Sequence, residues 1–273
     1  MNPVPGANIT GSRDPAEVIR QGFRVWSSIP TAIIAFAEGT PIANKVAYDG
    51  KNVVVTNLTA SEWAAFGVSS AVLAFTTVNW SDGGAVSDKL GQPVGFPGQI
   101  MDADIVFNPS YQFSTDSDNI TSDKLDFQAV ITHEIGHFLG LDHTPMVSST
   151  MFWSTTGGTS RQRTLTTDDI AGVSSLYPSA SFLSTGTLKG TVRTTANVPV
   201  FGAVVIAINS QGQSVAGVLT EPNGQYSIMG LDPGDYTVYA QTLDVFTISQ
   251  NFRTLSIAYP SSTVTTGFTG RFR

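Results

Sequence analysis

The chain has 273 residues, enough for one large domain or two smaller ones, and its 14 Lys and Arg against 21 Asp and Glu give a net charge of −7. This acidic balance argues against nucleic acid or an anionic membrane surface as the main partner. The chain has no cysteine, which excludes disulfides and thiolate metal ligands, and no run of residues approaching the ~20 apolar residues of a membrane span.

The N-terminal part of the chain predicts one helix followed by several strands. Residues 1–12 have the composition of a loose arm. Asp14 can cap a helix, Pro15 suits its first turn, and Glu17 can complete a capping box, while Pro30 ends the pattern. Strand-like runs then alternate with loops rich in Gly, Ser and Asp. These runs are residues 32–37, 53–57, 71–77 and 103–107.

The segment from residue 114 to residue 126 is rich in aspartate. Clustered carboxylates can hold calcium, a hard cation that prefers oxygen ligands, but the segment has no EF-hand pattern. We therefore expect a solvated acidic loop, with a calcium site as the alternative. The aspartates concerned are Asp116, Asp118, Asp123 and Asp126.

Residues 133–143 contain all three histidines of the chain, in the pattern H-E-x-x-H-x-x-G-x-x-H. Residues four apart lie on one face of a helix, so His133 and His137 can direct both imidazoles at one ion. Glu134 is turned by about 100° from His133 and can lie beside the metal without binding it. This spacing predicts a helix with two metal ligands and a carboxylate next to them.

The residues after this helix complete the predicted site. Gly140 can adopt the left-handed conformation that ends a helix, and the turn lets His143 supply a third nitrogen. Three protein nitrogens with an open fourth position describe a catalytic zinc rather than a closed structural site. A chance match on an amphipathic helix is the alternative, and five fixed positions argue against it. The apolar stripe expected on the opposite face is Phe127, Ile131, Ile135 and Phe138.

This extended motif resembles that of the metzincin family of zinc endopeptidases. The residues that carry the resemblance are His133, Glu134, His137, Gly140 and His143. Metzincins place a methionine in a tight turn beneath the zinc, and residues 149–153 look like that turn. The resemblance implies one zinc held by the three histidines, Glu134 as general base acting on a metal-bound water, and Met151 as a structural support that does not bind the metal.

Residues 167–178 predict a short closing helix that Thr166 can cap. The residues expected on its buried side are Ile170, Val173 and Leu176. Its DDIAG run and Leu-Tyr end resemble the final helix of the matrixin branch of the metzincins. Thr144 follows the third histidine, where matrixins usually have serine. Phe152 and Trp153, after the methionine, depart from the usual matrixin turn.

The matrixin resemblance raises one further expectation, for residues 91–99. In matrixins the segment near this place is an edge strand whose free backbone groups hold extended substrate. The prolines at positions 93 and 97 equally favour a plain surface loop, because proline cannot donate a ladder hydrogen bond. Both interpretations stay open here.

A different composition follows a Ser-rich linker at residues 179–186. Short alternating runs separated by turn signals at residues 222–224 and 232–234 favour a small all-β sandwich. The runs are residues 188–193, 203–209, 225–229 and 236–240. Their pattern resembles the carboxypeptidase regulatory-like domain, a transthyretin-like sandwich without chemistry of its own. Residues 246–273 could add a further strand or begin another segment.

The sequence therefore predicts an α+β chain. A metzincin-like catalytic domain, with a twisted mixed sheet and three helices, is expected over residues 1–178, and the sandwich over residues 187–273. The expected function is that of a secreted zinc-dependent endopeptidase acting on a protein or peptide substrate, which leaves the oligomeric state open. The alternative is a zinc-binding but non-catalytic adhesion or scaffold protein that acts through its sandwich.

Composition also bears on the location of the protein. Only 13% of the residues are charged, which suits a secreted protein, and the lack of cysteine favours a bacterial one. The first residues contain neither a basic region nor an apolar run. We expect that a signal peptide and any pro-segment have been removed.

Overall fold

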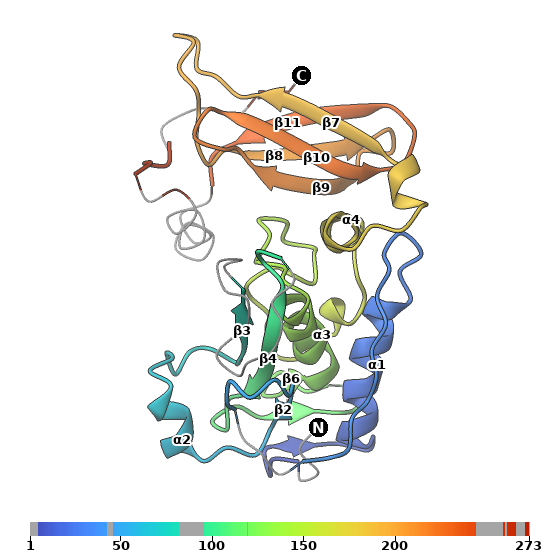
Figure 1. Cartoon of the computed structure of the whole chain (residues 1–273), viewed down its shortest axis with the longest axis vertical. Helices are drawn as coiled ribbons and strands as arrows, with labels where there is room; N and C mark the ends of the chain where they lie inside the picture. Colours follow the sequence, from blue (N-terminus) through green and yellow to red (C-terminus); the bar gives the residue numbers. More distant parts are fainter. Residues whose placement is uncertain are drawn as a thin grey trace. The chain divides into compact units, whose positions relative to one another are not determined.

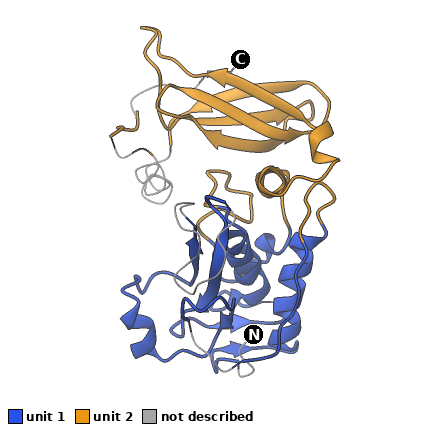
Figure 2. Ribbon diagram, viewed as in Figure 1, with its two compact units in different colours: residues 1–28, 35–141, 155–164 blue, residues 29–34, 142–154, 165–273 orange. Residues whose placement is uncertain are grey.

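A computed structural model of the chain describes residues 5–42, 46–81, 96–118, 120–243, 259, 261–265 and 271–272. The chain forms two compact units (Figure 2). The first comprises residues 1–28, 35–141 and 155–164, and the second comprises residues 29–34, 142–154 and 165–273. Helices with a mixed sheet in the first unit, and antiparallel sheets in the second, confirm the predicted α+β class. The domain boundaries predicted around residues 179–186 stay a prediction.

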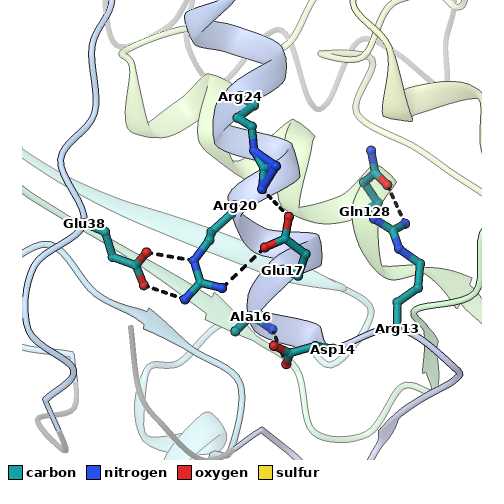
Figure 3. A network of polar contacts seen from close by, with 8 residues as sticks. All are labelled: Arg13, Asp14, Ala16, Glu17, Arg20, Arg24, Glu38 and Gln128. Atoms are coloured by element: carbon teal, nitrogen blue, oxygen red, sulfur yellow. Dashed lines mark hydrogen bonds and ion pairs between the residues drawn. The ribbon is translucent and has the colours of Figure 1, made fainter.

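Helix α1 (Pro15–Ser27) begins as its sequence predicts, because the Asp14 side chain accepts a hydrogen bond from the backbone N–H two residues on. The expected capping box is absent. The Glu17 carboxylate instead pairs with the guanidinium groups of Arg20 and Arg24 along the exposed face of the helix (Figure 3). Arg20 and Arg24 lie three and seven positions after Glu17, close to the same face of the helix. Their ion pairs with Glu17 therefore compete with the capping hydrogen bond.

The main sheet of the first unit has the strand order β2-β4-β3 (Figure 1). Strand β2 (Val54–Val55) is parallel to β4 (Ile100–Phe107), and β3 (Ala74–Trp80) is antiparallel to it. Within the described residues β3 is therefore the outer strand of a mixed sheet. The strand predicted at residues 71–77 begins and ends later in the chain than expected, as β3.

Several local predictions for the first 130 residues were wrong. Residues 5–12 are not a loose arm throughout, since β1 (Ile9–Thr10) pairs with β5 (Phe113–Ser114), which also pairs with β6 (Leu125–Asp126). Helix α2 (Ala60–Ala65) was not predicted, although Thr59 and Glu62 form a capping box at its start.

The strand predicted at residues 32–37 is also absent. Only an isolated bridge joins Ala32 to Pro178 there. The bridge is made by the N–H groups of Ile33 and Ser179, which donate to the carbonyl oxygens of Tyr177 and Thr31 over 2.8 Å and 3.0 Å.

Helix α3 (Phe127–Phe138) carries the predicted apolar stripe, with Phe127, Ile131 and Ile135 fully buried. It packs against α1, which lies beside it in Figure 1. The contact is close at Gly22, where an added Cβ would lie 3.0 Å from Cδ1 of Ile135. The indole N–H of Trp26 also donates to the carbonyl of Thr132 over 2.8 Å. The metal-motif helix is therefore fixed firmly to the core.

The second unit contains α4 (Thr167–Leu176) and the predicted β-rich region. Thr166 caps α4 in a capping box with Asp169, and Val173 is buried as expected. Leu176, by contrast, is 49% exposed, so its predicted burial was wrong. The helix packs against strands β9 (Ser214–Leu219) and β10 (Gln225–Leu231) of the same unit.

Two antiparallel sheets make up the β-rich region, with strand orders β10-β7 and β12-β11-β8-β9. Their core is formed by the buried side chains of Val205, Ala207, Ala216, Ile228 and Leu231. Strand β9 was not predicted, and β12 shows that residues 246–273 do add a strand. The strands are β7 (Gly186–Thr191), β8 (Val204–Asn209), β9 (Ser214–Leu219), β10 (Gln225–Leu231), β11 (Tyr236–Gln241) and β12 (Arg271–Phe272).

Single 3-10 turns lie at η1 (Arg161–Arg163) and η2 (Phe182–Ser184). None of the helices in the described part of the chain has the length and apolarity needed to cross a membrane.

Candidate metal centre

The structure brings the three histidines together. One ring nitrogen from each of His133, His137 and His143 lies within 4.8 Å of the others. The Nε2 atoms of His133 and His137 are 3.1 Å apart, close to the separation of about 3.3 Å that two nitrogens have on one tetrahedral zinc. Among the described residues this is the one group of three or more His, Cys, Asp or Glu side chains arranged to hold a metal. Three imidazole nitrogens are a donor set that fits zinc.

The end of α3 orients one of these histidines. The Nδ1–H of His137 donates to the carbonyl oxygen of Leu141 over 2.8 Å, which leaves the lone pair on Nε2. Leu141 is held in turn by its own N–H, which donates to Gly136 over 3.0 Å. The chain reverses direction here at Gly140, whose φ of 93° lies in the left-handed region that favours glycine. One turn thus ends the helix, orients His137 and redirects the chain toward His143.

Glu134 follows His133 in α3 and is only 4% exposed. Burial raises the pKa of its carboxyl group, and a hydrogen bond from Thr76 opposes that rise. The Thr76 hydroxyl on β3 lies 2.7 Å from Oε2 of Glu134 and 3.0 Å from its backbone oxygen. Sequence reasoning did not find Thr76, because nothing in the local pattern of β3 marks a partner 58 positions away.

Met151 lies in a buried turn and is 2% exposed. The N–H groups of Thr150 and Met151 donate to the two carboxylate oxygens of Asp169, each over 2.9 Å. The Met151 carbonyl accepts from the N–H of Thr144 over 3.1 Å. The first turn of α4 therefore holds the segment that contains Thr144 and Met151 in a closed loop.

The neighbouring Asp168 binds the same segment through side chains. Its Oδ2 accepts from the hydroxyls of Thr144 over 2.7 Å and Ser149 over 3.1 Å, and its Oδ1 accepts from the N–H of Gly217 over 2.8 Å. Burial raises the pKa of Asp168 to about 6, against the effect of these donors. Sequence reasoning used this residue only as part of a helix start. Acidic residues are common in the first turn of a helix, so the position of Asp168 alone did not mark these contacts.

The aspartate-rich segment is not simply a solvated loop. Asp126 caps α3, where Oδ1 accepts from the N–H of Ala129 over 2.9 Å, and its other oxygen lies 2.6 Å from Nε of Arg163. Asp116 accepts from the N–H and the hydroxyl of Ser12, both over 2.8 Å. The described aspartates of this segment do not gather as a metal-binding group, and the calcium alternative gains no support from them.

The predicted edge strand at residues 91–99 lies largely outside the described residues, which resume at residue 96. Residues 96–98 form a bend and turn that leads into β4, and Gly98 has φ of 83°. That part of the segment therefore forms a loop.

Comparison with known proteins gives two family matches. The sequence model of the matrixin family matches residues 7–178, and that of the carboxypeptidase regulatory-like domain matches residues 187–256. These two matches agree with the resemblances noted from the sequence.

Individual relatives match shorter stretches. Matrilysin of Rattus norvegicus is 37% identical over 81 residues, which cover 30% of this chain and 29% of matrilysin. Metalloendoproteinase 2-MMP of Arabidopsis thaliana is 33% identical over 135 residues, which cover 46% of this chain and 33% of the relative. Metalloendoproteinase 1-MMP of the same plant is 47% identical over 53 residues, which cover 19% and 14%. The chain thus spans a third or less of the length of each of these relatives.

Proposed function

The chain belongs to the matrixin family, and from that premise we propose that it is a secreted zinc-dependent endopeptidase that hydrolyses peptide bonds in a protein or peptide substrate. The observation that carries the proposal is the meeting of three imidazole nitrogens beside a buried carboxylate. The names of the relatives, which are metalloendoproteinases and matrilysin, support a metalloprotease.

In this proposal His133, His137 and His143 hold the zinc. When bound, zinc would supply a Lewis acid that polarises the scissile carbonyl group and makes a water molecule more acidic. Glu134 takes the proton of the attacking water as general base and passes it to the leaving amine. Its burial supports this role, because burial raises the pKa of the carboxyl group and so makes the carboxylate a stronger base.

Several further assignments belong to the same proposal. Met151 supports the site without binding the metal, and Gly140 ends the metal helix. Residues 1–178 form the peptidase domain, residues 179–186 the linker and residues 187–273 the sandwich. The two family matches, which end at residue 178 and begin at residue 187, support these boundaries. The low charge content of the chain supports secretion.

Replacement of Glu134 tests the proposal. Zinc-loaded full-length chain is incubated with an unstructured protein substrate, and the Glu134→Gln variant is treated in parallel. We expect the parent to cleave and the variant to bind zinc with similar affinity but to cleave at least about 100-fold more slowly, the usual range for loss of a general base. If both proteins bind zinc and neither cleaves, the peptidase proposal is wrong and the non-catalytic scaffold becomes the better account.

A further inference from the structure

Strand β9 makes an unusually close contact at Gly217. The N–H of this glycine donates to Oδ1 of Asp168 over 2.8 Å. A Cβ atom at this position would lie 2.6 Å from Sδ and 3.0 Å from Cγ of Met146. Glycine inside a strand commonly marks the close approach of another segment, and here that segment is the loop that begins with His143.

Asp168 connects this strand to the loop. Its second oxygen accepts hydrogen bonds from the hydroxyls of Thr144 and Ser149. Three donors from two different parts of the second unit thus converge on one carboxylate, and hydrogen bonds to an ionised acceptor are about twice as strong as neutral ones. Thr144 directly follows His143, so its position constrains where that histidine can lie.

Asp169, the next residue, has different hydrogen-bond partners. Asp169 binds only the backbone of the same loop and the cap residue of its own helix, at Thr150, Met151 and Thr166. It therefore fixes the loop from within the peptidase part of the chain. Asp168 adds the link to the sandwich, and it does so at the end of the loop that carries the histidine.

From these contacts we propose that Gly217 and Asp168 are positioning residues for the third metal ligand, so that the sandwich is a working part of the metal centre rather than an independent module. The inference rests on the proposed function in one respect, because it takes His143 to be a zinc ligand. It assigns to the carboxypeptidase regulatory-like region a role in holding the metal.

The test measures the zinc affinity of the full chain by competition with a chromogenic chelator. Gly217→Ala and Gly217→Val add side chains of increasing size that would clash with Met146. Thr144→Val removes the hydroxyl at nearly constant shape, and Thr144→Ser keeps it. Gly234→Ala and Gly234→Val are the matched controls, because the nearest atom to a Cβ there is 4.0 Å away.

We expect Gly217→Val and Thr144→Val to weaken zinc binding by about tenfold, the lower end of the range for groups that orient metal ligands. Gly217→Ala should fall between Gly217→Val and the parent, while Thr144→Ser and both Gly234 variants should stay within about twofold of the parent. The visible spectrum of the cobalt(II)-substituted protein should change in the same two weakened variants, since it reports the number and geometry of ligands.

Unchanged zinc affinity in the Gly217 variants would overturn the inference, and so would unchanged affinity in Thr144→Val or a loss in Thr144→Ser as large as that in Thr144→Val. If Gly217→Val does not fold, as judged by circular dichroism, Gly217→Ala and the Thr144 pair decide the outcome. Because the measured quantity is metal affinity, a parent that binds zinc without cleaving overturns only the proposed function. A parent that cleaves, with Gly217 variants of unchanged affinity, overturns only this inference.

Discussion

At the scale of single residues, hydrogen bonds fix the chemical form of two side chains in the candidate centre, His137 and Glu134. The Nδ1–H of His137 donates a hydrogen bond to a backbone carbonyl, and the carboxylate of Glu134 accepts one from the hydroxyl of Thr76. The first interaction frees a nitrogen lone pair for a metal. The second keeps a buried carboxylate from shifting its pKa further upward.

Thr76 provides a prediction at this scale. In Thr76→Val the ionised form of Glu134 loses a stabilising donor, so its pKa rises and the base form is lost at a higher pH than in the parent. We expect the acid limb of the pH profile of kcat to move to higher pH. The loss of rate should be largest on the acid side of the profile, where the protonated form of Glu134 accumulates. Thr76→Ser, which keeps the hydroxyl, is the control.

The measurement is kcat and KM from pH 5 to pH 9 with zinc saturating. A merely structural Thr76 would lower activity equally at all pH values in the valine variant. An unmoved acid limb in Thr76→Val would therefore contradict the role given to this hydroxyl.

At the scale of elements, the loop between the Met151 turn and α4 is tied to the start of the metal helix. Arg163 of η1 lies 2.6 Å from the carboxylate of Asp126, the residue that caps α3, and also donates to the carbonyls of Asp116 and Ser117. The N–H of Gly158 donates to the carbonyl of Lys124 over 3.1 Å. This loop is therefore held at two points to the segment that precedes α3.

The ion pair between Arg163 and Asp126 should be costly to break, because Asp126 is buried. The side chain of Asp126 is 1% exposed and that of Arg163 is 15% exposed. Arg163→Met should lower the free energy of unfolding by about 3 kcal/mol, because removal of one partner leaves a buried charge unpaired. Arg161→Met, in the same 3-10 turn but exposed, should change it by less than about 0.5 kcal/mol. Urea unfolding of both variants checks this, and equal losses would refute the tether.

Short-range features of the fold and the site could be predicted from the sequence, whereas contacts between distant segments could not. The histidine pattern, the glycine after it and the caps at Asp14 and Thr166 are local, since each couples residues only a few positions apart. Thr76 reaches Glu134 across 58 positions, and Gly217 reaches Asp168 across 49. No period of 2 or 3.6 residues contains that information.

Secondary structure was missed for related reasons. Strand β9 contains Gly217 and the small Ala216, which lower its strand signal, yet the glycine is there because a loop packs on it. The apolar run at residues 32–37 looked like a strand, but within the described part of the chain it makes only the isolated bridge between Ala32 and Pro178. At β9 a tertiary contact therefore outweighed the local propensity.

At the scale of the whole molecule, metal binding and folding should be linked. Zinc would join the end of α3 to the segment beyond Gly140, an arrangement that the unfolded chain does not have. A ligand that binds only the folded state stabilises it by about 2.7 kcal/mol when its free concentration is 100 times Kd.

We therefore expect a chelator to lower the Tm of the full chain, and the lowering to disappear in His143→Ala, which has already lost one ligand. Glu134→Gln keeps the three histidines and should retain the full zinc-dependent rise in Tm. Because zinc requires unprotonated imidazoles, this rise should shrink as the pH falls and should vanish near pH 4. Thermal unfolding with and without zinc from pH 4 to pH 8 provides the test. A rise in Tm that persists at pH 4, or one that survives in His143→Ala, would show that zinc stabilises the chain somewhere other than at the three histidines.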